Sequence, residues 1–190
     1  MKGIDLENLL VSSGAILNGH FLLTSGRHSN RYIEKFRVLE DPDFLNKITY
    51  GMAEYYKNKN IDIVLGAAIG GILIAGGVGR HLGVKHIFSE RINGKMELKR
   101  GFTLPKGSRV LIVEDIITTG GSVFELIKLA KENDAKIIGA INLVERSIEK
   151  IDFNINSITL LNLPNESWDQ SNCPLCENNI PLTKRGRTGK

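Results

Sequence analysis

The stretch that decides the fold runs Val110-Leu111-Ile112-Val113-Glu114-Asp115-Ile116-Ile117-Thr118-Thr119-Gly120-Gly121-Ser122. Its first four residues are apolar and predict a buried strand, 110–113. Glu114 and Asp115 follow at the carboxyl end of that strand, where open α/β sheets bind their ligands. Hydroxyl-bearing residues and two glycines then lead into a predicted helix, 122–133. The order of strand, glycine turn and helix indicates an α/β protein.

The same order recurs from Ile61 onward. A second helix is predicted over 71–82, and its internal glycines, 76–79, are expected to allow close helix packing. Apolar runs that alternate with helices indicate a mainly parallel central sheet flanked by helices on both faces. A charged stretch, 89–106, contains Asn93-Gly94 and predicts a long loop or an exposed hairpin. The predicted strands are Ile61–Leu65, Val84–Phe88, Val110–Val113, Ile137–Leu143 and Ile158–Leu161.

The N-terminal residues follow a different pattern. Leucines at helical spacing predict an amphipathic helix over 4–13. Two extended runs, 20–26 and 27–33, predict a hairpin about a Ser-Gly turn. A further helix is expected to begin near Asp41-Pro42-Asp43, with an acid before proline at its N-terminus, and to run toward Asn58.

Composition and charge exclude several classes of protein. The chain is 42% hydrophobic and 24% charged, which is typical of a soluble globular protein rather than a disordered one. Apolar runs are too short to span a membrane, and acids occur early at the N-terminus, so we expect a cytoplasmic protein without a membrane partner. The net charge is +4, but residues 1–183 carry 21 basic and 21 acidic side chains. The excess lies in the tail, 184–190, and we expect no nucleic-acid partner.

The residues after the central strand suit a sugar phosphate. Glycines let backbone N–H groups converge on an anion, and a helix N-terminus adds partial positive charge. Two carboxylates beside a phosphate would be repelled by it, unless they bind hydroxyls or a metal ion nearby. The alternative is a glycine turn whose acids are merely solvated. A second glycine turn, 66–71, follows the strand 61–65 and could approach another anion.

Residues 110–122 resemble the phosphoribosyl pyrophosphate motif of the type I phosphoribosyltransferases. The resemblance implies that Glu114 and Asp115 hold the ribose hydroxyls, that 118–122 wrap the 5′-phosphate, and that 67–71 meet the pyrophosphate. The residues implied to bind phosphoribosyl pyrophosphate are Glu114, Asp115, Ile116, Ile117, Thr118, Thr119, Gly120, Gly121, Ser122, Ala68 and Gly70.

Nearly the whole chain resembles the orotate phosphoribosyltransferases within that family. His20–Ser29 with Tyr32-Ile33 is similar to a hood over the orotate ring, and Arg146 matches an arginine that meets orotate. An arginine fork suits a carboxylated pyrimidine because it donates two parallel hydrogen bonds. Without the resemblance, a surface ion pair between Arg146 and Glu145 or Glu149 would be favoured. The residues implied to bind orotate are Thr24, Tyr32, Thr118 and Arg146.

The charged stretch Glu90–Gly101 resembles the family's mobile loop, which reaches into a neighbouring subunit. The implied catalytic residues are Arg91, Lys95 and Lys99, which could stabilise the departing pyrophosphate. The stretch departs from the family pattern Arg-Lys-x-x-Lys-x-His-Gly because it has no histidine and spaces its lysines differently. The choice between the two lysines is therefore open, and a solvated hairpin is the alternative.

The resemblance implies a single domain over 1–190, with a hood over about 1–40 and a C-terminal arm over about 164–190. It implies a homodimer with shared active sites that transfers a phosphoribosyl group to orotate in de novo pyrimidine (UMP) synthesis. Mg²⁺ would bind through the substrate, with no certain protein ligand. The alternatives are a phosphoribosyltransferase for a purine or other base, and a non-catalytic regulator that binds nucleic acid through its tail.

The two cysteines, Cys173 and Cys176, have the spacing of half a zinc site. A structural zinc site needs four ligands, and the sequence contains no second such pair, although a dimer could bring two pairs together. A reduced pair or a local disulfide is favoured instead. We assign no role to His81 and His86.

Overall fold

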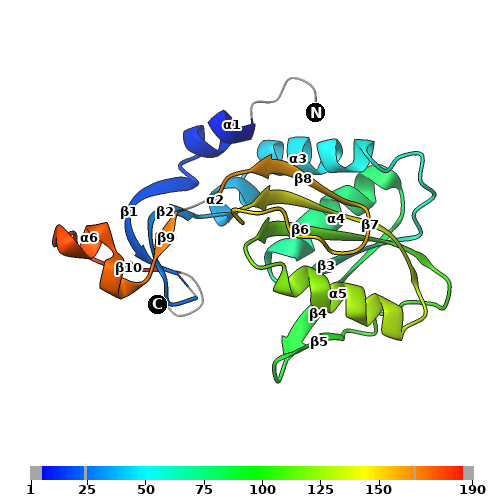
Figure 1. Cartoon of the computed structure of the whole chain (residues 1–190). Coiled ribbons are helices and arrows are strands. Elements are labelled where there is room, and N and C mark those ends of the chain that lie inside the picture. Colours follow the sequence, from blue (N-terminus) through cyan, green and yellow to red (C-terminus); the bar gives the residue numbers. More distant parts are fainter. Residues whose placement is uncertain (1–5, 24, 165, 186–190) are drawn as a thin grey trace.

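The computed structural model describes residues 6–23, 25–164 and 166–185, and it contains two sheets (Figure 1). The strands of the larger sheet are β3 (Ile63–Ala67), β4 (Lys85–Ile92), β5 (Lys95–Leu98), β6 (Arg109–Ile117), β7 (Lys136–Glu145) and β8 (Ser157–Asn162). Their order is β5-β4-β3-β6-β7-β8, and all pairs are parallel except β4 with β5. The predicted α/β class with a mainly parallel sheet is confirmed.

Helices cover both faces of this sheet because successive side chains of β6 point to opposite faces. Leu111 and Val113 pack in one core with α3 (Pro42–Glu54) and α4 (Gly70–Leu82). The alternate residues, Val110 and Ile112, pack in a second core with α5 (Gly121–Glu132). The four apolar residues of the central strand therefore bind the two helical layers together.

The helix α3 begins where the sequence predicts. The side chain of Asp41 accepts hydrogen bonds from the backbone N–H groups of Asp43 and Phe44, and Pro42 occupies the first turn. The helix ends at Glu54, before the predicted Asn58.

The smaller sheet joins the hood to the arm. Its strands are β1 (Ile16–Leu22), β2 (His28–Ile33), β9 (Ser167–Trp168) and β10 (Thr183–Lys184) in the order β10-β1-β2-β9. The predicted hairpin forms the middle, and the arm supplies both outer strands. The hood and arm boundaries stay a prediction. The short helices around this sheet are α1 (Leu6–Ser12), α2 (Phe36–Leu39), the 3₁₀ helix η1 (Gln170–Asn172) and α6 (Pro174–Glu177).

The stretch 89–106 contains an exposed hairpin, one of its two predicted forms. The strand β4 continues beyond the predicted Phe88 to Ile92, and β5 returns antiparallel at the edge of the sheet. Asn93 and Gly94 both have positive φ, at 48° and 81°, as a tight two-residue turn requires. Figure 1 shows this hairpin projecting beyond α5. No helix among the described residues is long and apolar enough to cross a membrane.

The glycines inside α4 serve close packing, as the sequence predicts. A Cβ on Gly77 would lie 2.5 Å from the Cγ2 and Oγ1 atoms of Thr49 on α3, and Thr49 is fully buried. A Cβ on Gly76 would meet nothing closer than His86, at 3.8 Å. Only one of these two adjacent glycines is therefore required by its neighbours.

We expect Gly77→Ala to lower the free energy of unfolding by about 1–3 kcal/mol, because α3 and α4 must separate to admit the methyl group. The matched variant Gly76→Ala should be neutral or gain up to about 1 kcal/mol, because alanine favours the helix. Urea denaturation of both variants measures the difference. Equal stabilities would contradict the packing role of Gly77.

Candidate active site

The two acids of the central stretch lie inside the strand β6. The sequence predicts that the strand ends at Val113, but pairing with β7 continues to Ile117 opposite Glu145. Glu114 is 7% exposed and Asp115 is 2% exposed. The alternative of solvated acids is therefore wrong, since both carboxyl groups are buried.

Asp115 is paired with a cation from a distant part of the chain. Its Oδ2 atom lies 2.7 Å from the Nζ atom of Lys35, which directly precedes α2. Its Oδ1 atom accepts a hydrogen bond from the backbone N–H of Ile116. Sequence reasoning missed Lys35, because eighty residues separate it from Asp115 and no local pattern marks it. The ion pair offsets the cost of burying the carboxylate.

The second glycine turn passes directly against Asp115. A Cβ on Gly70 would lie 1.6 Å from the Oδ2 atom of Asp115, so only glycine fits there. The preceding peptide bond, between Ala68 and Ile69, is cis. The structure thus brings together the two glycine turns that the sequence places at separate strands.

Both turns present a helix N-terminus at the same edge of the sheet. The helix α4 follows β3 and the helix α5 follows β6, and these two strands are parallel neighbours. Neither helix has a hydrogen bond from an N-cap side chain. First-turn N–H groups without a cap are ready to bind anions. The N-termini of α4 and α5, which suit anions, therefore lie at the edge of the sheet that carries Glu114 and Asp115.

The turn before α5 needs glycine for two reasons. Gly120 has φ +76°, and a Cβ there would lie 2.7 Å from the ring of Phe153. The neighbouring residues Thr118, Thr119 and Gly121 are exposed. Phe153 thus packs against the buried side of the turn, while Thr118 and Thr119 are exposed on its other side. This arrangement suits a phosphate at the surface of the site.

Arg146 follows β7 and lies between the two sheets. Its backbone N–H donates to the carbonyl of Ile117 at 2.8 Å. Its side chain lines one small hollow together with the hood residues Arg31 and Ile33, and with Ile16 and Leu163. In Figure 1 the arrowheads of β6, β7 and β8 point toward the hood sheet. Of the predicted orotate residues, Tyr32 of the hood and Arg146 therefore lie near enough to interact electrostatically.

The Arg146 side chain is unsatisfied within the described part of the chain. Its Nε atom is buried and has no hydrogen-bond partner there, and no ion pair forms with Glu145 or Glu149. Glu145 accepts hydrogen bonds from Ser147, Ile151 and Thr159 instead. Burial lowers the pKa of Arg146, and desolvation raises that of Tyr32. A half-buried guanidinium whose Nε atom has no partner among the described residues suits an anionic ligand. Thr24 lies outside the described residues.

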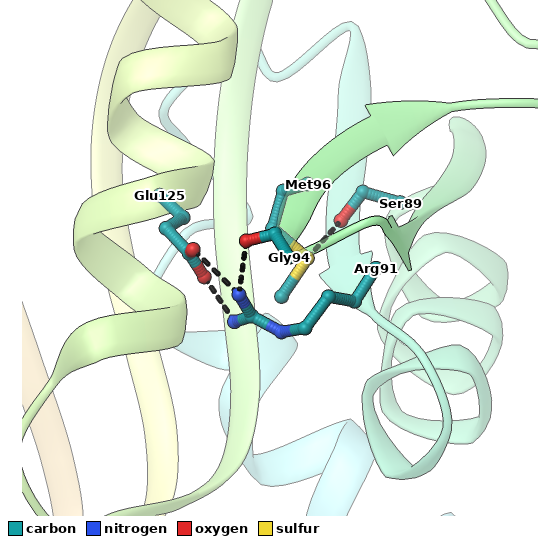
Figure 2. A network of polar contacts seen from close by, with 5 residues as sticks. All are labelled: Ser89, Arg91, Gly94, Met96 and Glu125. Atoms are coloured by element: carbon teal, nitrogen blue, oxygen red, sulfur yellow. Dashed lines mark hydrogen bonds and ion pairs between the residues drawn. The ribbon is translucent and has the colours of Figure 1, made fainter.

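The cations of the β4–β5 hairpin differ in their partners. Figure 2 shows the guanidinium of Arg91 donating to both carboxylate oxygens of Glu125 on α5 and, at 2.9 Å, to the carbonyl of Gly94. Lys99 pairs with Glu97 at 2.7 Å. Lys95 has no ion pair within the described ranges, and it is exposed. The Arg91 pair connects the hairpin to α5, which begins directly after the glycine turn at Gly120.

Burial favours the protonated form of Glu114. Desolvation, reinforced by the charge of Asp115, raises the pKa of Glu114 to about 8. Its Oε1 atom also accepts a hydrogen bond from the backbone N–H of Asp115 at 3.1 Å. The folded protein therefore keeps a proton on Glu114 at pH values where an unfolded chain, with a pKa near 4.5, releases it.

The wild-type free energy of unfolding should fall between about pH 5 and pH 8, because the folded state binds more protons than the unfolded state in this window. Glu114→Gln removes this contribution, so its stability should fall less over the same window. Urea denaturation at both pH values measures the two slopes, with the exposed Glu149→Gln as the control. A slope unchanged by Glu114→Gln would contradict the raised pKa.

Comparisons with known proteins agree with this geometry. Residues 37–176 match the family described as phosphoribosyl transferase domain. An orotate phosphoribosyltransferase of Desulforamulus reducens is 43% identical over 186 residues, which are 98% of this chain and 97% of that protein. One from Chlorobium phaeobacteroides is 47% identical over 92% of this chain and 91% of its own length. The crystal structure of orotate phosphoribosyltransferase from Aeropyrum pernix matches with a TM-score of 0.70 and 26% identity, over 83% of this chain and 93% of that one. The chain therefore belongs to the phosphoribosyltransferase family, as one of its orotate phosphoribosyltransferases.

Proposed function

We propose that the chain transfers the phosphoribosyl group of phosphoribosyl pyrophosphate to orotate through the residues described above. The products are orotidine 5′-monophosphate and pyrophosphate, in de novo pyrimidine (UMP) synthesis, and we place the reaction in the cytoplasm. The observation that carries the proposal is the meeting of three features at one edge of the sheet: two uncapped helix N-termini, two buried acids and the unpaired Arg146.

Both glycine turns contribute to the binding site for phosphoribosyl pyrophosphate. Thr118–Ser122 bind the 5′-phosphate with backbone N–H groups and hydroxyls, and Ala68–Gly70 meet the pyrophosphate. Asp115 and Glu114 hold the ribose hydroxyls between these two anions. A charged carboxylate accepts a hydrogen bond and a protonated one donates, which matches hydroxyls that do both.

The orotate ring lies against Arg146, under the hood. The Arg146 guanidinium binds the orotate carboxylate or carbonyl oxygens, and Tyr32, Thr24 and Thr118 complete the pocket. The orotate ring nitrogen is the nucleophile: it forms a bond to the anomeric carbon of the ribose as the bond to pyrophosphate breaks, and its proton passes to the departing pyrophosphate or to water. No side chain attacks, so the residues position the reactants and exclude water.

The hairpin residues stabilise the leaving pyrophosphate. Arg91 is engaged by Glu125 and Lys99 by Glu97, so Lys95 is the free cation among the three predicted catalytic residues in the described structure. We assign charge stabilisation on pyrophosphate mainly to Lys95. The exposed, projecting hairpin suits entry into the site of a second subunit, and we propose a homodimer on that ground.

Magnesium, when bound, offsets the negative charge of the pyrophosphate and ribose oxygens. In the described residues, a group of three or more metal-ligating side chains occurs in the hood and arm, and none occurs around Glu114 and Asp115. The active-site residues therefore fit an ion that takes its ligands mainly from the substrate. Asp115 is already paired with Lys35, which agrees with a role toward hydroxyls.

The proposal is tested by incubating the protein with phosphoribosyl pyrophosphate, Mg²⁺ and either orotate or adenine, and following orotate absorbance or AMP formation. Orotate should be consumed and adenine left unchanged. Arg146→Lys should raise KM for orotate by about 10- to 100-fold, since it keeps the charge but loses the two parallel hydrogen bonds. Turnover of adenine alone would overturn the substrate, and an unchanged KM would overturn the role of Arg146.

Lys95→Met should lower kcat by about 100-fold, because a cation that acts on the leaving group contributes in the transition state. Lys99→Met, the matched change on the same hairpin, should lower kcat only a few-fold because Lys99 is already paired with Glu97. Steady-state kinetics at saturating substrates measure both values. The reverse order of the two effects would assign the role to Lys99.

A further inference from the structure

A cluster of four side chains joins the N-terminal hairpin to the C-terminal arm. His20 lies on β1 and His28 begins β2, whereas Cys173 and Cys176 lie at the first turn of α6. One ligand atom from each residue lies within 4.8 Å of the others. Both cysteines are free thiols, so they form no local disulfide. The sequence offers only these two cysteines where a structural zinc site needs four ligands, and the structure places two histidines of the same chain beside them.

The distances between these atoms approach the edges of a tetrahedron around one ion. The Nε2 atom of His20 lies 3.6 Å from the Sγ atom of Cys173 and 3.8 Å from that of Cys176. The Nδ1 atom of His28 lies 3.3 Å from the Sγ atom of Cys176. Zinc bonds of about 2.3 Å to sulfur and about 2.0 Å to nitrogen give N–S edges of roughly 3.5 Å. The two nitrogens are 2.8 Å apart and need to separate by roughly half an ångström.

Hydrogen bonds alone do not satisfy this cluster. The Nδ1 atom of His20 lies 2.7 Å from the carbonyl of Ile180, which only accepts, so Nδ1 carries the hydrogen. In the neutral ring the Nε2 atom then presents a single lone pair. Three groups compete for that lone pair: the Nδ1 atom of His28 and both thiols. A cation at the centre accepts electron pairs from all four groups at once.

The carbonyl of Ile180 also acts as a supporting contact for a metal ligand. Metal-binding histidines usually donate their other ring N–H to a carbonyl or carboxylate, which fixes the ring and its tautomer. Ile180 belongs to the same arm as the cysteines, and its N–H donates to the carbonyl of Leu175 within that arm. The arm thus supplies two thiols and the group that orients His20.

We propose that His20, His28, Cys173 and Cys176 bind one zinc ion per chain as a structural site. Two thiolates and two imidazoles in tetrahedral array favour zinc among the common metals. All four ligands come from the protein, and three of them are at most 3% exposed, so no position is open for a substrate. The site fastens the arm to the hood and takes no part in the transfer chemistry.

In the described residues, the other contacts between the arm and the hood come from two short strands, several hydrogen bonds and the ion pairs Arg27–Asp169 and Arg185–Glu34. The strands β9 and β10 have two residues each. The ion pair between Arg27 and Asp169 is largely exposed, which makes its contribution small. Arg27 and Ser29 also donate to backbone carbonyls of Ser167 and Glu166. Metal ligation is therefore the strongest available tie between segments about 150 residues apart.

The test is zinc content by mass spectrometry of the full-length protein, purified without a metal-affinity tag. We expect about one zinc per chain in the wild type, less than a tenth of that in Cys176→Ser and His28→Asn, and the wild-type value in the exposed control His86→Asn. Cobalt substituted into the wild type should give the visible bands of a tetrahedral site with thiolate ligands. A zinc-selective chelator should lower Tm by at least about 5 °C.

Three results would overturn the proposal. The first is a wild-type protein that holds no zinc even after incubation with zinc salt under reducing conditions. The second is a stoichiometry of one zinc per two chains, which would assign the ion to cysteines of both subunits. The third is wild-type zinc content in His28→Asn. Because metal content and cobalt spectra are read without substrate, they stand apart from the outcome of the transferase assay. The wild-type cobalt spectrum decides the matter if the variants fail to fold.

Discussion

The carboxylate of Asp115 lies inside the central strand, where its negative charge is stable only beside a cation. Lys35 provides that cation at 2.7 Å, from the segment that links the hood to α3. The same oxygen occupies the space that a side chain at position 70 would need. The Oδ2 atom of Asp115 therefore constrains two distant positions: Lys35, directly before α2, and Gly70, at the start of α4. The turn before α4 therefore lies directly against the strand that leads into the turn before α5.

Glu114 and Asp115 are adjacent and both buried, but their partners differ. Asp115 forms an ion pair with Lys35 at 2.7 Å. Glu114 is buried without such a partner at short distance, and its pKa rises accordingly. Two residues of the same chemical type therefore meet different environments within one strand. Such separation of two carboxyl groups by their environments is a common way to assign them different roles.

Much of the fold could be predicted from local sequence, because the predicted strands and the helices α3, α4 and α5 have strong apolar patterns with glycine or proline at their ends. The end of β6 could not be predicted in this way. Glu114 and Asp115 are unusual residues for a buried strand, and pairing with β7 continues past them. The Lys35–Asp115 and Arg91–Glu125 ion pairs could not be predicted for a different reason: each pair joins segments far apart in the chain. The position of His20 and His28 beside the cysteines was not predicted either, because both histidines lie in the stretch assigned to the hood. Two histidines separated by seven residues across a predicted hairpin, together with a distant Cys-x-x-Cys, are the sequence features that could have indicated a four-ligand site.

The hood sheet has its earliest and latest strands side by side, with β10 paired to β1. During synthesis, the hairpin of β1 and β2 emerges first, yet its outer neighbours are made only when residues 167–184 follow. The edges of the hairpin stay exposed throughout this interval, and exposed strand edges are prone to pair with other chains. The larger sheet is already complete when β8 has been made. Maturation of this protein is therefore ordered, with the hood sheet completed last.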